Sequence, residues 1–441
     1  MPKLTIQEGY KLTGEYSIKE GESIIGREEG VALQLNHTGV SRRHCKLVRK
    51  GKETFIEDLG SRNGTFLNAH IVQKRTLLNN LDQIQIDDVL LIYTDTDLSD
   101  SDITDHEMEP VPSNSGKPGA PADDFGFVQE TVNKIADNMA KVIQGKDSVI
   151  RNVLIALMSD GHVLLEDVPG VGKTKLAQAL ARSISTDFKR IQFTPDMLPN
   201  DITGISIFDE SQRKFVFMPG PVFTNVVLAD EINRGTPRVQ SSLLECMAES
   251  MITVDGNPHV LRKPFFVIAT QNPVDFHGTY PLPEAQLDRF LMRLSMGYPD
   301  HENELLILQT QAETNPLNTI SHVADANDIL RCQSIIRKVH VSNQVRDYIV
   351  TIIDETRKHP ALTYGCSTRA ALALMRASQS LAAINGREHV LPRDVRDLAG
   401  FVLAHRTPLR LQARAEWADA GKVIHAILEQ LPISRWEEAV E

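Results

Sequence analysis

The sequence has no apolar run that approaches the ~20 residues a helix needs to cross a bilayer. Its first residues, Met-Pro-Lys-Leu-Thr-Ile-Gln-Glu-Gly, lack the apolar core of a secretory signal peptide, so we expect a cytoplasmic protein. Cysteine is scarce, with four in 441 residues, and the four are widely scattered without metal-ligand spacing. This usage excludes a disulfide scaffold and favours buried, reduced thiols.

An excess of basic charge is also lacking, since 47 Lys and Arg face 58 Asp and Glu for a net charge of −11. Most of the excess lies between Asp95 and Asp124, where nine acidic residues face one base, Lys117, and the net charge is −8. This segment also holds four prolines, so residues 95–124 are predicted to form a disordered linker. The rest is nearly neutral and shows no basic stripe or recognised DNA-binding module, so nucleic acid is not an expected partner.

What the sequence does contain is a glycine-rich loop in a strand–helix context. Residues 162–166 form a short apolar run, and apolar residues recur at helical spacing over 176–184. Such a loop lets backbone N–H groups converge on phosphate oxygens at a helix N-terminus. Lys173 is expected to reach the β and γ phosphates of ATP, and Thr174 to hold Mg²⁺. Asp167 stands where the common pattern has its first glycine, which leaves the turn geometry open. The candidate nucleotide-binding residues are Pro169, Gly170, Val171, Gly172, Lys173, Thr174 and Lys175.

Polar residues end two further apolar runs downstream. Residues 226–229 lead to Asp230 and Glu231, and residues 265–271 lead to Asn272. Because the carboxyl ends of parallel strands meet at one edge of a sheet, these side chains are expected beside the phosphate loop. Asp230 would hold Mg²⁺, Glu231 would polarise the attacking water, and Asn272 would align water and γ-phosphate. A solvated acidic pair and an Asn that caps a strand are the plain alternatives.

With these motifs the region resembles an AAA+ ATPase, and more narrowly a member of the MoxR family. The resemblance is carried by residues 165–174, 229–234, 269–273, 282–290 and 365–370. It implies that Arg289 is an arginine finger acting in a neighbouring subunit, that Arg369 is a second sensor on a lid, and that the subunits form a hexameric ring. A guanidinium delivered in trans would neutralise charge on the transferred phosphoryl group. Arg293, expected one turn further along the same helix, is a weaker candidate, and surface ion pairs are the alternative for both arginines.

Two segments of this region, 204–218 and 251–261, have the pattern of β-hairpins. The resemblance implies that the first is an insert within the second helix and faces the axis of the ring. Phe215 and Phe217 fall on one face of this hairpin by alternation. They either contact a substrate protein in the pore, or one of them packs beneath the hairpin.

Residues 1–94 have a different sequence pattern, in which short β-like runs alternate with turns that contain Gly, Asn and Asp. This pattern predicts an all-β sandwich. Their loops hold Gly26-Arg27, Ser41-Arg42-Arg43-His44 and Ser61-Arg62-Asn63-Gly64-Thr65. In order and spacing these motifs resemble a forkhead-associated (FHA) domain. That resemblance implies binding of phosphothreonine peptides.

The candidate phosphopeptide site has arginines for charge-assisted bonds to a dianionic phosphate, a hydroxyl donor, and an amide to hold the peptide backbone. His44 and Gly64 are expected to be structural, the first bracing the loop and the second permitting the turn. Arg43 and Arg62 could be solvated bystanders, and a vestigial fold used only for packing is the alternative for the whole domain. The candidate residues are Arg27, Ser41, Arg42, Arg62 and Asn63.

From about residue 299 the apolar spacing becomes helical, which fits the small lid of an AAA+ protein. The chain is therefore predicted to be multidomain. An FHA sandwich over 1–94 and the linker over 95–124 precede an α/β P-loop core with a parallel sheet over 125–298 and a helical lid over 299–441.

These features predict a Mg²⁺-dependent ATPase, a chaperone-like remodelling enzyme recruited to phosphothreonine-containing partners, which a Ser/Thr kinase would supply. The resemblance also implies clients with von Willebrand factor A domains. A phosphothreonine adaptor with a nucleotide-gated scaffold ring is the alternative. Thr94 and Thr104 each precede an acidic residue by three positions, so we also hypothesise that a phosphorylated linker occupies the FHA site.

Overall fold

A computed structural model describes residues 2–94 and 122–437, apart from positions 9–10, 29, 36–39, 52, 68–69, 73, 79–81, 87–88, 169, 210–213, 255, 273–278 and 314–315. The chain divides into two compact units, Met1–Lys117 and Pro118–Glu441. Pro169, Thr104 and nearly all of the acidic segment lie outside the described residues. Within the described ranges, no helix has the length and apolar character needed to cross a membrane.

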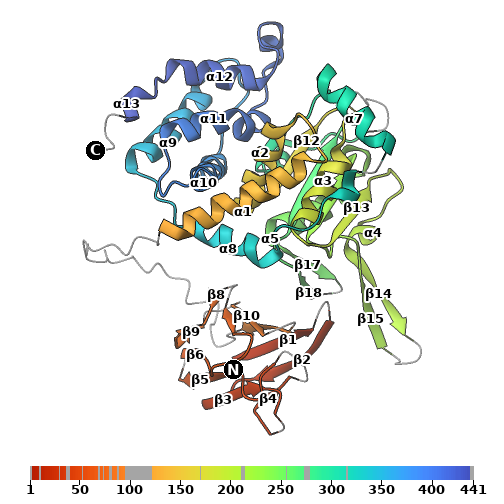
Figure 1. The fold of residues 1–441 in the computed structure, drawn as a ribbon, viewed down its shortest axis with the longest axis vertical. Coiled ribbons are helices and arrows are strands. Elements are labelled where there is room, and N and C mark those ends of the chain that lie inside the picture. The colour runs from red at the N-terminus through yellow and green to blue at the C-terminus, as the bar shows by residue number, and fades with distance from the viewer. Residues whose placement is uncertain are drawn as a thin grey trace. The chain divides into compact units, whose positions relative to one another are not determined.

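The first unit is a sandwich of two β-sheets (Figure 1). One sheet has the strand order β2-β1-β11-β10-β7-β8, and the other has the order β4-β3-β5-β6-β9. Side chains that alternate toward the space between the sheets form its apolar core, which includes Leu4, Ile25, Leu47, Ile56 and Ile84. The predicted all-β fold of this region is confirmed. Its strands are β1 (Lys3–Glu8), β2 (Lys11–Ser17), β3 (Gly21–Gly26), β4 (Leu33–Gln34), β5 (Cys45–Lys50), β6 (Glu53–Asp58), β7 (Phe66–Leu67), β8 (His70–Ile71), β9 (Thr76–Leu77), β10 (Gln83–Ile86) and β11 (Val89–Thr94).

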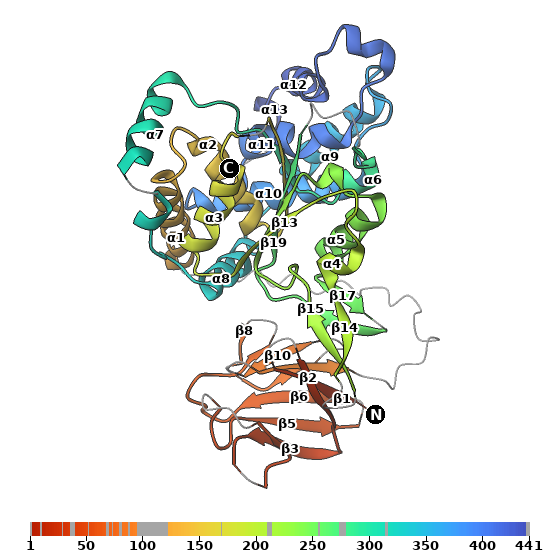
Figure 2. The ribbon, with the colours of Figure 1, turned by 90° about the vertical axis from the view of Figure 1, so that its right-hand side faces the viewer.

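The second unit is built around a parallel sheet with the order β13-β16-β19-β12-β20. Figure 2 shows α1 and α3 on one side of this sheet and α4 and α5 on the other. Covered in this way, β16 and β19 are almost continuously buried, as the apolar runs before Asp230 and Asn272 predicted. The predicted α/β core is confirmed. Its strands are β12 (Val163–Glu166), β13 (Phe188–Gln192), β16 (Val226–Asp230), β19 (Phe266–Gln271) and β20 (Met292–Leu294).

The C-terminal part of this unit is helical, and α9 to α13 gather on one side of it (Figure 1). Apolar side chains of the core and of this helical region belong to one continuous buried cluster, which includes Val153, Leu176, Ile329, Leu374 and Leu398. The predicted helical lid is confirmed, and it shares its interior with the α/β core. The helices are α1 (Ala122–Ala140), α2 (Asp147–Met158), α3 (Lys173–Ser183), α4 (Pro199–Thr203), η1 (Ile232–Arg234), α5 (Pro237–Glu249), α6 (Glu284–Leu287), α7 (His301–Glu313), η2 (Pro316–Thr319), α8 (Ala326–Ile336), α9 (Asn343–Lys358), α10 (Thr368–Ile384), α11 (Pro392–Leu403), η3 (Ala404–Arg406), η4 (Leu411–Ala415), α12 (Ala420–Gln430) and α13 (Ser434–Glu437).

Two antiparallel hairpins extend from the core at the places where the sequence predicted them. One is β14–β15 (Gly204–Asp209 and Lys214–Pro219), directly after α4, and the other is β17–β18 (Met251–Val254 and Asn257–Val260). They lie side by side in both ribbon views (Figures 1 and 2).

The predicted linker differs from the structure at its far end, because α1 begins at Ala122. Phe125 and Val128 of this helix are buried in the core. Their packing fixes the first turn of the helix, which therefore begins before residue 125. At the near end, Thr94 is the last residue of β11 and pairs with Lys3. The hypothesis that a phosphorylated Thr94 occupies the FHA site would require the end of β11 to separate from β1.

Candidate functional sites

The phosphate loop connects β12 to α3. Gly170 and Gly172 have φ of +88° and +97°, in the left-handed region that favours glycine, and Gly172 is the N-cap of α3. The backbone N–H groups of this first turn therefore remain available to phosphate oxygens. Lys173 is half-buried and its Nζ donates to the Asp167 carbonyl oxygen at 2.8 Å. Burial lowers the pKa of Lys173, although the nearby carboxylates of Asp230 and Glu231 oppose the shift.

Asp167 has a structural role that the sequence pattern does not reveal. Its buried carboxylate accepts hydrogen bonds from Ser295 Oγ at 2.8 Å, from Met296 N at 2.5 Å and from Gly297 N at 3.1 Å. These residues directly follow β20 and lead toward α7. Asp167 therefore ties the entrance of the phosphate loop to the segment that leaves the sheet, a function that glycine cannot perform.

Asp230 and Glu231 lie at the carboxyl end of β16, beside Thr270 of β19. Thr270 Oγ1 donates to Asp230 Oδ1 at 2.6 Å and accepts from Glu231 N at 2.8 Å. Glu231 has φ of +54°, which turns its side chain out of the strand direction. Asn272 follows β19, is buried, and lines the same cavity as the two carboxylates. The three residues thus meet at one sheet edge.

The sequence did not point to the polar residues that contact these carboxylates. Arg190 of β13 binds Asp230 Oδ2 through Nε at 3.0 Å and Nη2 at 2.5 Å. Gln192, at the end of the same strand, donates to Glu231 Oε2 at 2.8 Å, and Arg234 donates to that oxygen at 3.1 Å. β13 pairs with β16 in parallel, so its last residues reach the sheet edge beside the acidic pair. Arg190 and Gln192 reach the acidic pair only because β13 lies next to β16, and the sequence does not reveal this strand order.

A cavity of about 700 Å³ joins these residues. Its polar lining residues include Lys173, Thr174, Arg190, Asp230, Glu231 and Asn272, and its apolar lining residues include Val142, Ile143, Met296, Ile307 and Leu308. A triphosphate with Mg²⁺ fits the first set of groups, and a nucleobase fits the second. No group of three or more His, Cys, Asp or Glu side chains among the described residues could hold a metal alone. One hydroxyl and one carboxylate suit Mg²⁺, which usually binds through few protein ligands plus phosphate and water.

The two predicted functional arginines do not line this cavity. Arg289 follows α6, and its Nη1 donates to the Leu244 carbonyl oxygen at 2.9 Å. Arg369 lies in the first turn of α10, where its Nε is 4.0 Å from Asp288 Oδ2. The expectation that Arg293 continues the helix of Arg289 is wrong, because α6 ends at Leu287 and Arg293 lies on β20. The sheet requires a strand there, and Arg293 pairs with Glu166 at 2.9 Å.

The two phenylalanines of the first hairpin have different environments. Phe215 is 73% exposed and contacts Phe208, with ring centroids 5.4 Å apart. Phe217 stacks on His259 of the second hairpin, with centroids 4.0 Å apart, and also contacts Phe223. Phe217 is therefore the packed member of the pair, and Phe215 is the one available to a partner.

In the β-sandwich, backbone hydrogen bonds bring the candidate phosphopeptide loops together. Arg27 N donates to Ser41 O at 3.0 Å, and Arg62 N donates to Ser41 Oγ at 3.0 Å. A Cβ at Gly26 would lie 2.1 Å from the Arg42 carbonyl oxygen, so this close approach of the two loops requires glycine. Arg27, Arg42, Arg62 and Asn63 are exposed around Ser41.

His44 braces these loops from below. It is buried, its Nδ1 accepts from Ser41 N at 3.0 Å, and its Nε2 therefore donates to Gly64 O at 3.0 Å. Asp58 supports the neighbouring turn through Ser61 and Thr65. Burial raises the pKa of Asp58, but the bonds from these two residues outweigh it and lower the pKa overall.

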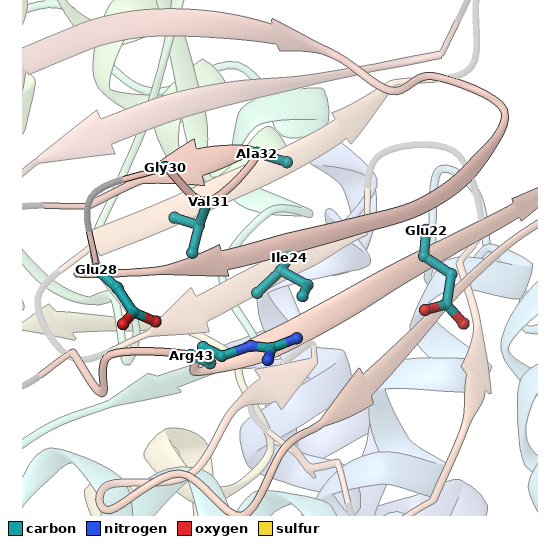
Figure 3. A pocket seen from close by; sticks show the side chains of 7 residues that line it. All are labelled: Glu22, Ile24, Glu28, Gly30, Val31, Ala32 and Arg43. Carbon is teal, nitrogen blue, oxygen red and sulfur yellow. The ribbon is translucent and has the colours of Figure 1, made fainter.

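A shallow cavity of about 350 Å³ lies beside the loops (Figure 3). Arg43 extends across Ile24 toward Glu22 along this cavity, and Glu28 lies at its other side (Figure 3). Arg43 is exposed and lines this cavity.

Comparison with known proteins identifies the family of each part of the chain. Residues 162–292 match the ATPase family associated with various cellular activities (AAA), residues 354–427 match the AAA lid domain, and residues 23–87 match the FHA domain. A phosphate loop at the edge of a parallel sheet, with an adjoining helical lid, defines the class of AAA+ ATPases. A candidate ATPase from Cytophaga hutchinsonii has a similar structure, with a TM-score of 0.66 and 38% identity over 70% of this chain and 97% of that one.

Two curated relatives narrow the class. The chain is 46% identical to the uncharacterised protein YeaC of Bacillus subtilis, over 69% of this chain and 96% of that protein. It is 38% identical to the chaperone MoxR1 of Mycobacterium tuberculosis, over 73% of this chain and 87% of that protein. The chain belongs to the MoxR family of AAA+ ATPases and carries an FHA domain before the ATPase core.

Proposed function

We propose that this protein hydrolyses ATP with the help of Mg²⁺ and uses the energy to remodel partner proteins. One observation carries the proposal: Lys173, Thr174, Asp230, Glu231 and Asn272, from three separate parts of the sequence, line a single cavity. A binding site for nucleotide alone needs the phosphate loop, whereas the carboxylate pair and the buried amide suit bond cleavage.

Each residue has a role that follows from its position. Lys173 neutralises charge on the β and γ phosphates, and Thr174 and Asp230 would hold Mg²⁺, which supplies further charge neutralisation when bound. Glu231 orients the attacking water and accepts its proton, and the Asn272 amide aligns that water with the γ-phosphate. Glu231 must first exchange its bonds to Gln192 and Arg234 for a bond to water.

We further propose that the site is completed by a neighbouring subunit in a hexameric ring. Arg289 lies outside the cavity of its own subunit, which supports a role in trans. Arg369 lies on the lid and its side chain is 55% exposed, so it can turn toward the nucleotide when the lid closes.

The FHA domain is proposed to select partners that carry phosphothreonine. The joined loops of Arg27, Ser41, Arg42, Arg62 and Asn63 support this role, and a Ser/Thr kinase would supply the modification. The chaperone name of MoxR1 supports remodelling as the use of ATP, and we retain proteins with von Willebrand factor A domains as proposed clients. Four unpaired, buried cysteines support the proposed cytoplasmic location.

One observation favours the alternative, an adaptor with a slowly hydrolysing scaffold ring. Arg190 donates hydrogen bonds to Asp230, and Gln192 and Arg234 donate to Glu231. Both carboxylates are therefore bonded to protein side chains in this structure. A ring that rarely released these bonds would bind nucleotide and seldom cleave it.

Phosphate release by the full chain separates the two functions. Glu231→Gln preserves the size of the side chain and should lower turnover at least ~100-fold without loss of ATP binding. Equal phosphate release by wild type and Glu231→Gln would refute the enzyme. Titration of a phosphothreonine peptide, followed by fluorescence anisotropy, tests the FHA site. Arg27→Ala should weaken binding ~10-fold or more, whereas Arg43→Ala serves as the matched control.

A further inference from the structure

The turn that carries Arg289 is held by the lid of its own subunit. We call residues Asp288–Leu291 the finger turn. Arg406, at the end of η3, donates from Nε to Asp288 Oδ1 at 2.6 Å, from Nη2 to Phe290 O at 2.7 Å and from Nη1 to Leu291 O at 3.2 Å. The preceding residue, His405, donates from Nε2 to Phe290 O at 3.0 Å. Two consecutive lid residues thus bind three of the four residues of the finger turn.

This contact is buried, which makes its geometry specific. The Arg406 side chain is 4% exposed, and the Asp288 side chain is 23% exposed. Burial lowers the pKa of Arg406, and the ion pair with Asp288 opposes that shift, so removal of the Asp288 carboxylate would leave a buried charge without its partner. The planar fork of arginine reaches a carboxylate and two carbonyl oxygens at once, whereas a lysine ammonium cannot reproduce that arrangement.

Asp288 also contacts the second functional arginine. Its Oδ1 binds Arg406, and its Oδ2 lies 4.0 Å from Nε of Arg369. When Arg369 turns toward nucleotide bound in its own subunit, Asp288 loses a neighbouring positive charge while its bond to Arg406 remains. A change in the position of Arg369 would therefore alter the charge around the residue that precedes Arg289.

We propose that Arg406 and Asp288 are positioning residues for Arg289, and that they couple the lid of one subunit to the ATP site of the next. This inference rests on the proposed ATPase ring, in which Arg289 acts in trans. Lid movement in one subunit displaces η3, η3 displaces the finger turn, and Arg289 is delivered to or withdrawn from the neighbouring site. In this structure Arg289 Nη1 donates to Leu244 O of α5, and this bond must break before the guanidinium can reach the neighbouring site.

Mixed rings test this proposal, because a residue that acts in trans can be rescued by its neighbour. Arg406→Lys, Asp288→Asn and Arg289→Ala are each assayed for ATP hydrolysis and ATP binding, alone and mixed with Glu231→Gln. We expect each variant alone to hydrolyse ATP at least ~10-fold more slowly than wild type and to bind ATP normally. In a random one-to-one mixture with Glu231→Gln, about one quarter of the interfaces would join an intact Glu231 to a correctly held Arg289, and activity should rise accordingly.

The control is Arg410→Lys, which removes a lid arginine whose Nε donates to Leu362 O at 2.8 Å within the lid and does not contact the finger turn. It should keep wild-type turnover. If Arg289→Ala is rescued in the mixture but Arg406→Lys and Asp288→Asn are not, the positioning role is wrong while the ring stands. If Arg406→Lys fails to fold, Asp288→Asn decides by the same rescue. An inactive wild type would instead refute the proposed function and this inference with it.

Discussion

Replacing Asp167 by glycine is predicted to weaken the protein, although glycine is the residue that phosphate loops usually carry at this position. The substitution removes the acceptor for Ser295 Oγ, Met296 N and Gly297 N. Met296 is buried, so its N–H would lose its partner away from water. Hydrogen bonds to an ionised acceptor contribute roughly 1.5–3 kcal/mol each, and water entering from the adjacent cavity recovers part of this.

From these contacts we expect Asp167→Gly to lower the free energy of unfolding by about 3 kcal/mol, including the greater freedom of glycine in the unfolded chain. For a unit of this size the loss corresponds to a fall in Tm of about 5 °C. The segment after β20 should loosen as well. Because Met296 lines the cavity, the KM for ATP should rise several-fold.

Thermal unfolding of the full chain, with and without ATP, measures both effects. Asp167→Asn keeps one acceptor oxygen and loses the charge, so it should show about half the destabilisation. A free energy of unfolding within about 0.5 kcal/mol of wild type, together with an unchanged KM, would refute this role for Asp167, since such a change is within the range of an ordinary surface substitution.

Three other predictions follow from the structure. Arg190→Gln should lower the Mg²⁺ concentration needed for half-maximal turnover, because Arg190 competes for Asp230; an unchanged or higher requirement would contradict this. His405 is buried, and burial lowers its pKa well below 6.5. Below pH 6.5 the unfolded chain therefore takes up a proton that the folded chain does not, so less urea should be needed to unfold the protein as the pH falls. His405→Gln should reduce that pH dependence, and an equal slope in both proteins would exclude His405 as its source. Phe217→Ala should destabilise the hairpins by about 1–3 kcal/mol, because it removes the ring stacked on His259. Phe215→Ala should leave unfolding unchanged and weaken binding of a partner protein, and equal stability of the two variants would refute this assignment.

Sequence reasoning worked best where a residue's role is set within a few positions of the chain. The phosphate loop needs glycine at positive φ and a lysine at the start of a helix, and all of these are local to residues 170–173. Asp230 and Asn272 were placed beside the loop because buried strands run into them, and parallel strands end at a common edge.

Predictions from the sequence were wrong or missing where the structure joins segments that are distant in the chain. The shared helix of Arg289 and Arg293 was inferred from spacing alone, but β12 accepts Met292–Leu294 as a parallel neighbour, and pairing prevailed over helical spacing. The hydrogen-bond donors to the Asp167 carboxylate lie about 130 residues away, and no local sequence pattern predicts them.

The kinds of chemistry present can be read from the amino-acid sequence: a phosphate loop, an acidic pair and a polar amide at strand ends, and basic loops on a β-sandwich. These features depend on local backbone geometry and on strand ends, which short-range patterns encode. The contacts that these groups make come from the folded structure. Examples are Arg190 with Asp230, Asp167 with the segment after β20, and Arg406 with the turn of Arg289. Those contacts depend on strand order and on the packing of the lid, because both bring together side chains that the chain itself keeps far apart.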